Sequence, residues 1–477
     1  MQTSSRSPVL APLVVAGSSF MENLDGTVIA TALPQMAHSF GASAVSLSIG
    51  VTAYLLTVAV FIPISGWMAD RFGARTVFAS AIAIFTLASA LCGFSNSLWS
   101  FTAARILQGV GGSMMLPVGR IVVMRTAGKQ DLMRAIATIT WPALIAPVLG
   151  PPLGGFITTY ASWRWIFFLN LPLGIVALTL VLFIIRNERT DARKPFDLRG
   201  FLLTAAALAL MMYGLDLSGR AASGWLLPLA IVAVGLAIGI VAVRHALARP
   251  QPIVSLRPVR IQTFTISSVT GGTLFRVTVG ATPVLLPLMF QIGFGMDAFR
   301  SGLLVLFYAG GNLAMKTVTT RTLRLFGFRN VLVVNSAAVA LSLIVFAFFR
   351  PAFPAALMAV LLFAGGLARS LQFTSLNTLA FADIGPKDTS DASTLYAMVQ
   401  QIAFGMGAAL AAVLVNVSQA ARGAAVPDFS DFRTAFLALA LIVAISVLFF
   451  LRLRPDAGSE VSSHRPARSV ARPAAGE

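Results

Sequence analysis

Stretches of about 20 mostly apolar residues, the length of a helix that crosses a bilayer, recur along most of this chain. Fourteen can be distinguished. They lie near residues 9–33, 46–67, 77–95, 99–122, 134–159, 164–186, 198–217, 225–246, 264–291, 302–320, 330–349, 355–381, 392–416 and 433–453. The pattern predicts an all-α polytopic membrane protein with fourteen transmembrane helices.

The composition agrees with a membrane protein and excludes an ordinary soluble one. Hydrophobic residues make up 57% of the 477, charged residues only 11%, and mean hydropathy is +0.85. A soluble chain carries roughly a quarter charged residues. The single cysteine, Cys92, lies in an apolar run, can form no internal disulfide, and is expected to pack between helices.

The net charge of +18 would suit a nucleic-acid-binding protein, but the distribution of the charge argues against that function. With the N-terminus in the cytoplasm, most of the 35 Lys and Arg fall in the expected cytoplasmic segments. Positive residues orient membrane helices in this way, and they contact anionic lipid. We therefore expect a multi-pass protein of the cell inner (cytoplasmic) membrane, with both termini cytoplasmic and no nucleic-acid partner.

Two acids, Glu22 and Asp25, lie inside the first apolar span. An ionised carboxylate at membrane depth is costly unless it is paired, hydrated or protonated, and residues three apart are neighbours on a helix. We interpret the pair as a site that binds and releases protons or cations. The alternative is a permanent ion pair that only holds helices together.

The fourth span carries a polar stripe that could meet these acids. Arg105, Gln108, Gly109 and Gly112 are spaced to share one helical face, and the glycines let another helix approach. From the helical rise, Asp25 lies roughly 12 Å and Arg105 roughly 9 Å below the outer ends of their helices. These depths are compatible with direct or water-bridged contact between them.

Such a contact suggests how protons could be coupled to movement. Burial favours the neutral form of a carboxyl group, whereas a nearby arginine favours the charged form, so helix movement can change its protonation. Glu22 and Asp25 should titrate together. The residues do not decide which of them carries a transported proton, and Glu22 could bind cationic substrate instead.

The chain also repeats itself faintly. RFGARTV at 71–77 is echoed by LFGFRNV at 325–331, and ARILQ at 104–108 by ARSLQ at 368–372. Parallel repeats of this kind imply two halves around a central path. We expect a six-helix half at 1–195, a two-helix insert at 196–255, a second six-helix half at 256–455 and a disordered cytoplasmic tail at 456–477.

Five motifs in order make the chain resemble the major facilitator superfamily, in particular its fourteen-helix drug:proton antiporter branch and bacterial multidrug exporters within it. The motifs are LDGTVIATALP at 24–34, GWMADRFGAR at 66–75, RILQGVGG at 105–112, GPPLGG at 150–155 and WRWIFFLNLPLG at 163–174. The resemblance implies a 6+6 helix core with two inserted helices, alternating access, and proton-coupled export. It points to Asp25 as the proton carrier.

The resemblance also implies a cytoplasmic gating loop, made of Gly66, Asp70, Arg71, Gly73 and Arg75. Its glycines would permit turns, and Asp70 could accept backbone N–H bonds or pair with an arginine. The loop would then latch the two halves together in one conformation. The alternative is a loop whose charges only set the topology.

In the fifth span, Gly150, Pro151, Gly154 and Gly155 are expected to form a hinge or seal, because proline removes backbone donors and glycine permits close packing. The family pattern prefers glycine where Ala146 and Pro142 stand. That departure weakens the case for antiport over other transport modes.

The C-terminal half contributes Arg276, Arg369 and Lys316 to its spans. Lys316 is expected to extend toward the membrane interface. Arg276 and Arg369 need a partner or a cavity. Either they bond backbone carbonyls or Asn377, or they form, opposite the acidic first helix, a cationic lobe suited to an anionic or zwitterionic substrate.

No feature supports an enzyme: the chain lacks a Walker-type phosphate loop and its three histidines are scattered. We predict a proton-coupled exporter of small amphipathic compounds that acts as a monomer, with no cofactor and no metal. Two alternatives stay open. One is a dedicated exporter of an organic anion or metal chelate, and the other is a transport-inactive membrane sensor or scaffold.

Overall fold

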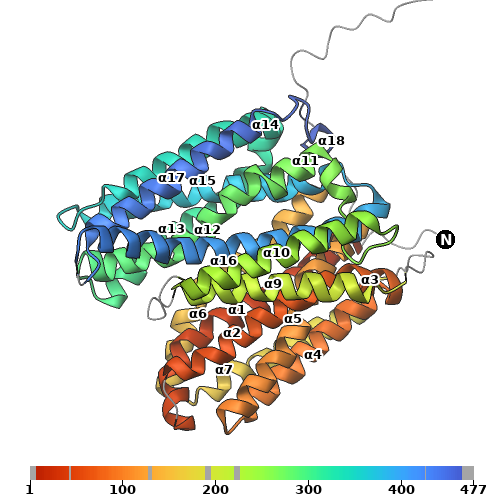
Figure 1. Ribbon diagram of the computed structural model, residues 1–477, viewed down its shortest axis with the longest axis horizontal. Helices are drawn as coiled ribbons and strands as arrows, with labels where there is room; N and C mark the ends of the chain where they lie inside the picture. The colour runs from red at the N-terminus through yellow and green to blue at the C-terminus, as the bar shows by residue number, and fades with distance from the viewer. Residues whose placement is uncertain are drawn as a thin grey trace, which may run out of the picture.

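The structure is a computed structural model, and it describes residues 7–41, 44–126, 131–187, 195–219, 226–424, 426–462 and 464. Within these ranges every regular element is helical, as predicted (Figure 1). The first half contains α1 (Ser7–Phe40), α2 (Ala44–Phe61), η1 (Ile62–Ile64), α3 (Ser65–Phe72), α4 (Ala74–Phe94), α5 (Leu98–Thr126), α6 (Leu132–Tyr160), α7 (Arg164–Phe168) and α8 (Asn170–Ile184).

Two helices follow, α9 (Leu198–Gly219) and α10 (Leu226–Ala248). The second half contains η2 (Arg257–Arg260), α11 (Gln262–Phe264), η3 (Thr265–Val269), α12 (Gly271–Leu288), η4 (Met289–Gly293), α13 (Ala298–Ala314), α14 (Lys316–Ala347), α15 (Ala355–Ala382), η5 (Pro386–Asp388), α16 (Thr389–Ala421), α17 (Phe429–Phe450) and α18 (Ser459–Ser462).

Eleven helices in the described ranges are long and apolar enough to cross a membrane. The other three expected spans correspond to α1, α6 and α13, so the structure is compatible with fourteen. The tenth span differs from its expected limits of 302–320. It consists of α13 and the first residues of α14, and it ends where Gly327 takes a φ of 71°. Residues 321–326 were expected in a loop, because arginines occur among them, but they continue the helix.

The helices form two bundles with the inserted pair between them (Figure 1). In the first bundle α1 packs on α6 and α4 on α5, and in the second α13 packs on α15 and α12 on α16. Helix α9 contacts α2 of the first bundle, α16 of the second, and its neighbour α10. The insert therefore covers one seam between the bundles, along their length.

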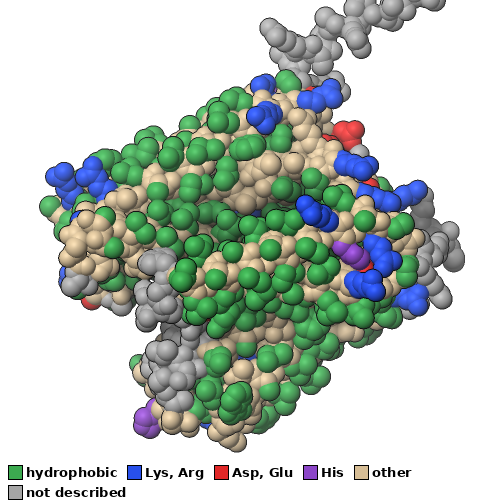
Figure 2. Space-filling model, viewed as in Figure 1, with side chains coloured by type: hydrophobic (Ala, Val, Ile, Leu, Met, Phe, Trp, Pro, Cys, Tyr) green, Lys and Arg blue, Asp and Glu red, His purple; other side chains and the backbone are tan. Residues whose placement is uncertain are grey.

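The surface supports a membrane location. Figure 2 shows hydrophobic side chains over the middle of the visible face, whereas Lys and Arg gather at the ends of the helices.

The tail is not disordered from its beginning, as had been expected for 456–477. Residues 459–462 form α18, in which Val461 and Ser462 are buried. Gly458, at a φ of 67°, lets the chain turn against Phe328. An apolar side chain and a turn glycine thus fix this segment on the second half. Residues 463 and 465–477 lie outside the described part of the chain.

Candidate functional site

Asp25 lies at the centre of a buried polar cluster in the first half and is only 2% exposed. One of its oxygens accepts a hydrogen bond from Arg105 Nη1 at 2.7 Å. The other accepts from Gln108 Nε2 at 3.0 Å and from Asn170 Nδ2 at 2.8 Å. The carboxylate is thus held by one charged and two amide donors, from α5 and α8.

The cluster has a further layer of contacts. Gln108 and Asn170 both donate to the Ser89 hydroxyl of α4, at 2.7 and 3.2 Å. The Arg105 guanidinium, with no exposed surface, lies 4.3 Å from the centre of the Tyr54 ring. Its Nε and Nη2 have no hydrogen-bond partner among the described residues. Arg105 Nη1 donates to Gln108 Oε1 as well as to Asp25. Because Asp25 is its charged partner, the position of Arg105 depends on the charge of that carboxylate.

The expected contact between Asp25 and Arg105 is present, and Gln108 shares the face of Arg105 as its spacing indicated. The glycines of that stripe pack as expected: a Cβ on Gly109 would collide with Thr57, and one on Gly112 with Tyr54. Asn170 and Ser89 were not singled out from the sequence. The signal for Asn170 was an amide at the start of an otherwise apolar span.

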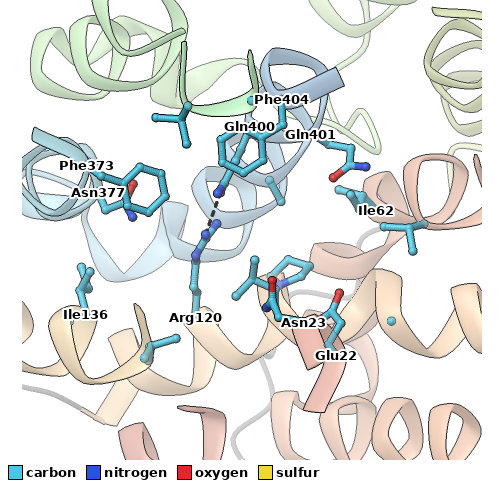
Figure 3. Close-up of a pocket in the computed structure, with 18 of the residues that line it drawn as sticks. Glu22, Asn23, Ile62, Arg120, Ile136, Phe373, Asn377, Gln400, Gln401 and Phe404 are labelled. Atoms are coloured by element: carbon cyan, nitrogen blue, oxygen red, sulfur yellow. Dashed lines mark hydrogen bonds between the residues drawn. The ribbon is translucent and has the colours of Figure 1, made fainter. Parts of the chain in front are cut away.

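Glu22 does not join this cluster. It lines a central cavity of about 470 Å³ and makes no hydrogen bond to any described residue. Figure 3 shows its carboxylate beside Asn23, at the edge of the cavity. Most of the wall is apolar. The lining includes Val58, Ile62, Leu116, Pro117, Ile136, Ile139, Val279, Pro283, Phe373, Phe381 and Phe404.

Two arginines line the same cavity, one from each half: Arg120 of α5 and Arg369 of α15. Arg120 Nη2 donates to Gln400 Oε1 at 2.8 Å (Figure 3), and its guanidinium lies 4.4 Å from the centre of the Tyr396 ring. Arg120 was not among the candidate residues predicted from the sequence. Continuing the stripe of Arg105 along α5, through Gly112 and Leu116, would have reached it.

Of the two arginines proposed for substrate binding, only Arg369 lines the cavity. Arg276 is 1% exposed and bonds internal groups: it donates to the Ser267 carbonyl at 2.9 Å and to the Tyr396 hydroxyl at 2.6 Å, with Asn377 Oδ1 at 3.5 Å. The π-helical turn at η3 presents that carbonyl to the side chain. The structure thus favours the internal-partner alternative for Arg276.

Lys316 also lies elsewhere than expected. Its ammonium does not extend to the membrane interface but donates to the Thr374 hydroxyl of α15. The reason is its place at the start of α14, in the middle of the tenth span rather than near its end.

The gating loop meets the second half through Asp70. Its carboxylate accepts hydrogen bonds from Arg125 at 2.9 Å and from the Ser390 hydroxyl at 2.6 Å. Gly73 makes the turn between α3 and α4 at a φ of 91°. Arg71 is exposed and Arg75 half-buried, and neither has a hydrogen bond or ion pair with a described residue.

Gly66 has a different role from the turn that was expected. It lies inside α3, where a Cβ would come within 2.4 Å of the Thr394 hydroxyl and 2.9 Å of the Ser390 carbonyl. Its lack of a side chain therefore permits the close approach of α16, from the other half.

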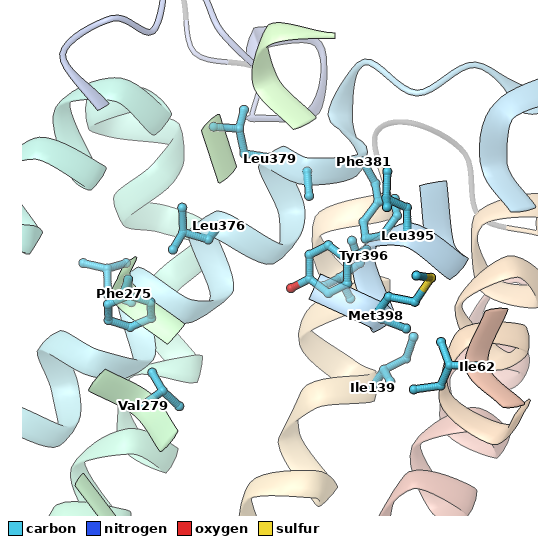
Figure 4. Packing of buried hydrophobic residues seen from close by; sticks show 14 of the residues in the cluster. Ile62, Ile139, Phe275, Val279, Leu376, Leu379, Phe381, Leu395, Tyr396 and Met398 are labelled. Carbon is cyan, nitrogen blue, oxygen red and sulfur yellow. The ribbon is translucent and has the colours of Figure 1, made fainter. Parts of the chain in front are cut away.

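Polar residues on one face of α16 hold the two halves together. Five hydrogen bonds link this face to the first half: Asp70 and Arg125 with Ser390, Pro117 with Ser393, Ser65 with Thr394, and Arg120 with Gln400. Buried apolar residues continue the interface, where Ile62 and Ile139 approach Met398 (Figure 4). This end of the central path is closed.

The fifth-span glycines differ from one another. A Cβ on Gly150 would lie 2.3 Å from the Thr27 hydroxyl, so α6 packs closely on α1 just beyond Asp25. Gly155 has nothing within 4 Å of its Cβ position, and Gly154 accepts a bond from Thr158 through its carbonyl. Helix α6 continues through Pro151, whose side chain lies outside the described set.

The comparison with protein families gives one match. The model of the Major Facilitator Superfamily matches residues 15–408 of this chain. A protein of Citrobacter koseri named "Putative multidrug resistance protein MdtD" is 37% identical over 465 residues, which cover 96% of this chain and 97% of that protein. A protein of the same name from Escherichia coli is 36% identical over 464 residues, with the same coverage.

Solved structures of similar fold include the human organic anion transporter MFSD10, with a TM-score of 0.64 and 14% identity over 93% of this chain and 99% of that one. The proton:xylose symporter XylE aligns with a TM-score of 0.65 and 15% identity, over 96% and 99%. At these identities the likeness shows the fold.

Proposed function

The chain belongs to the major facilitator superfamily, and we propose that it is a proton-driven exporter of small amphipathic compounds. A member of this family is a multi-pass membrane transporter and not an enzyme.

The observation that carries the proposal is the sealed contact between Asp25 and Arg105. A proton on Asp25 would remove the negative partner of an arginine that has no exposed surface. An uncompensated buried charge costs several kcal/mol. Protonation of Asp25 would therefore favour a rearrangement of α1 against α5. Asp25 is our choice for the transported proton, because Glu22 faces the cavity instead.

Alternating access would follow from movement of residues 1–195 against residues 256–455, with the insert at 196–255 between them. The bonds from α3 and α5 to α16 close one end of the path. The segments that connect the helices at this closed end are rich in arginine and lysine. We therefore assign the closed end to the cytoplasm, with both termini there. The gating loop would open and close this contact, and Gly150 would let α6 slide on α1.

The cavity supports an amphipathic substrate. Its volume of about 470 Å³ lies within the range of drug-sized ligand sites, and its wall is largely apolar with a few polar groups. The relatives named as multidrug resistance proteins favour the same class. We propose that a single chain suffices, because the cavity is formed by its own two halves.

A second candidate, the dedicated exporter of an organic anion or metal chelate, is favoured by a specific observation. Two arginines line the cavity against one glutamate. The sign of the preferred substrate is therefore the property that separates the two candidates.

Purified protein in liposomes with an imposed pH gradient tests the function. We expect uptake of several amphipathic dyes into vesicles with an acidic lumen, and none when an ionophore collapses the gradient. Dye uptake at the same rate with and without the pH gradient would contradict proton coupling. Absence of uptake for every compound would favour the transport-inactive sensor or scaffold.

A further inference from the structure

We propose that Arg120 binds the anionic group of the transported compound, and that Gln400 displaces that group from Arg120 when the halves close on the α16 side. The inference rests on the proposed transport function. It adds the residue that selects substrate charge and the step that releases the substrate.

The first support is the incomplete bonding of Arg120. Its guanidinium donates through Nη2 to Gln400 and stacks on Tyr396, whereas Nη1 is buried with no hydrogen-bond partner among the described residues. None of the ion pairs among the described residues includes Arg120, and the acid that acts on its charge from the same cavity is Glu22. A half-buried cation with one buried, unbonded nitrogen is incompletely compensated, and an anion entering the cavity would supply both a charge and an acceptor.

The second support is the set of groups around it. Arg369 lines the cavity from the opposite half, so an anion can interact with a guanidinium from each side. Asn312, only 4% exposed, also lines the cavity, and its Oδ1 has no partner among the described residues. That oxygen can accept a hydrogen bond. The site therefore fits an organic anion that also carries a donor, with its apolar part against Phe373 or Phe404.

The third support is the identity of the group that Arg120 already holds. Gln400 comes from α16, the helix whose polar face closes the halves, and it lines the same cavity. Figure 3 shows Arg120 reaching across the cavity to this amide. When α16 moves away from α5, both Nη atoms of Arg120 become available to a substrate. When α16 returns, the Gln400 oxygen occupies one of them.

This competition would lower the affinity for substrate at the step that opens the path to the far side. A substrate that binds with the α16 side open would meet a full arginine fork, and a bidentate contact is the stronger one. Closure would replace one of the two bonds between Arg120 and the substrate with the bond to Gln400, and so lower the affinity for the substrate. Release would then follow on the far side of the membrane without any change in the charge of Arg120.

Two dyes on one xanthene frame, the anion fluorescein and the cation pyronin Y, provide matched probes. Their binding to protein in lipid nanodiscs is measured by fluorescence anisotropy, with empty nanodiscs as blank. Gln400→Ala should bind fluorescein about tenfold more tightly, the scale of one charged hydrogen bond, and pyronin Y as before. Arg120→Gln should bind fluorescein at least tenfold more weakly.

Gln401→Ala is the matched control, because Gln401 lines the cavity next to Gln400 but makes no hydrogen bond to a described residue. It should change the two affinities by the same factor, because it removes no bond to Arg120. In liposomes, Gln400→Ala should also release fluorescein more slowly, so that the maximal rate falls while half-saturation occurs at lower concentration.

Unchanged fluorescein binding in Arg120→Gln, or no binding to the wild type, would overturn the anion site. Equal behaviour of Gln400→Ala and Gln401→Ala would overturn the competition. Because binding is measured without a pH gradient, these results are independent of proton coupling. The predicted binding pattern without gradient-driven flux would reject the proposed function and leave Arg120 as an anion site.

Discussion

The two halves of this protein carry the same short motif with different partners. On α5 it is Arg105 with Gln108, and on α15 it is Arg369 with Gln372. Gln108 donates to the Ser89 hydroxyl at 2.7 Å, and Gln372 donates to the Ser336 hydroxyl at 2.7 Å.

The arginines differ. Arg105 has no exposed surface and pairs with Asp25. Arg369 lines the central cavity, lies 5.5 Å from the centre of the Tyr308 ring, and has no carboxylate partner among the described residues.

The difference comes from the first helix of each half. Helix α1 brings a carboxylate to its arginine, whereas α12 carries another arginine, Arg276, which bonds a carbonyl and a tyrosine hydroxyl instead. A carboxylate can gain and lose a proton near neutral pH when its surroundings change, but an arginine stays charged. We infer that only the first half exchanges protons, whereas both halves contribute fixed positive charge to the cavity, through Arg120 and Arg369.

The largest expected effect that would sharpen this contrast is on stability. Arg105→Ala should lower the free energy of unfolding by about 3 to 5 kcal/mol, because it leaves a buried carboxylate without its cation. Arg369→Ala should cost less than about 1 kcal/mol, because its side chain faces a cavity rather than a partner. Unfolding of both variants in detergent micelles gives the comparison, and equal losses would remove the distinction between the halves.

A smaller effect is expected where the halves meet. Asp70→Asn should weaken the bonds from Arg125 and Ser390, which are worth about 1.5 to 3 kcal/mol for a charged group. The population with the α16 side open should rise about tenfold or more. Spin labels at positions 71 and 387, in a Cys92→Ser background, report the distance between halves by electron paramagnetic resonance.

The control for that experiment is Arg75→Gln, because Arg75 has no ion pair with a described residue. It should leave the distance distribution unchanged. An open population that does not respond to Asp70→Asn would show that the contact follows closure without stabilising it.

The smallest effect concerns Asp197, a buried acid that directly precedes the first helix of the insert. Burial alone would raise the pKa of Asp197, but hydrogen bonds from the Gly200 N–H, His245 and the Ile253 N–H outweigh it and hold the pKa below its ordinary value. Such an acid adds stability above the unfolded pKa, near pH 4, and loses it as the pH falls through the folded pKa.

Asp197→Ala should therefore lower the free energy of unfolding by about 1 kcal/mol at pH 7, the typical value of a helix cap. The loss should become smaller below about pH 4. Asp297→Ala removes a cap from α13 that accepts from the Arg300 N–H, and it provides the matched loss of a helix cap, with a cost of about the same size at pH 7. A cost for Asp197→Ala that stays constant down to acid pH would contradict the assigned bonds.

The sequence predicted the helical fold from its apolar spans, and it predicted the core of the site where spacing along a helix places residues on one face. Spacing placed Arg105 and Gln108 together, and depth placed Asp25 opposite them. The same reasoning could not find Asn170 or Ser89, because the spacing of residues on one helix does not show which other helices pack against that face.

The contacts between the halves were harder still. Arg120, Ser390, Ser393 and Thr394 were not predicted as site residues, because their role exists only when α16 packs against α5. The prediction for Gly66 was wrong for the same reason: this glycine permits the close approach of α16, which is distant in the sequence. Arg276 found internal partners at a π-helical turn that periodicity does not predict.

The central claim is that Asp25 carries the proton, and one pair of variants in liposomes tests it most directly. Asp25→Asn keeps the shape of the side chain but cannot ionise, so it should exchange bound dye across the membrane at near wild-type rates and show no accumulation driven by a pH gradient. Glu22→Gln, three residues away on the same helix and facing the cavity, should keep gradient-driven accumulation. Wild-type accumulation by Asp25→Asn, or its loss in Glu22→Gln alone, would contradict the account.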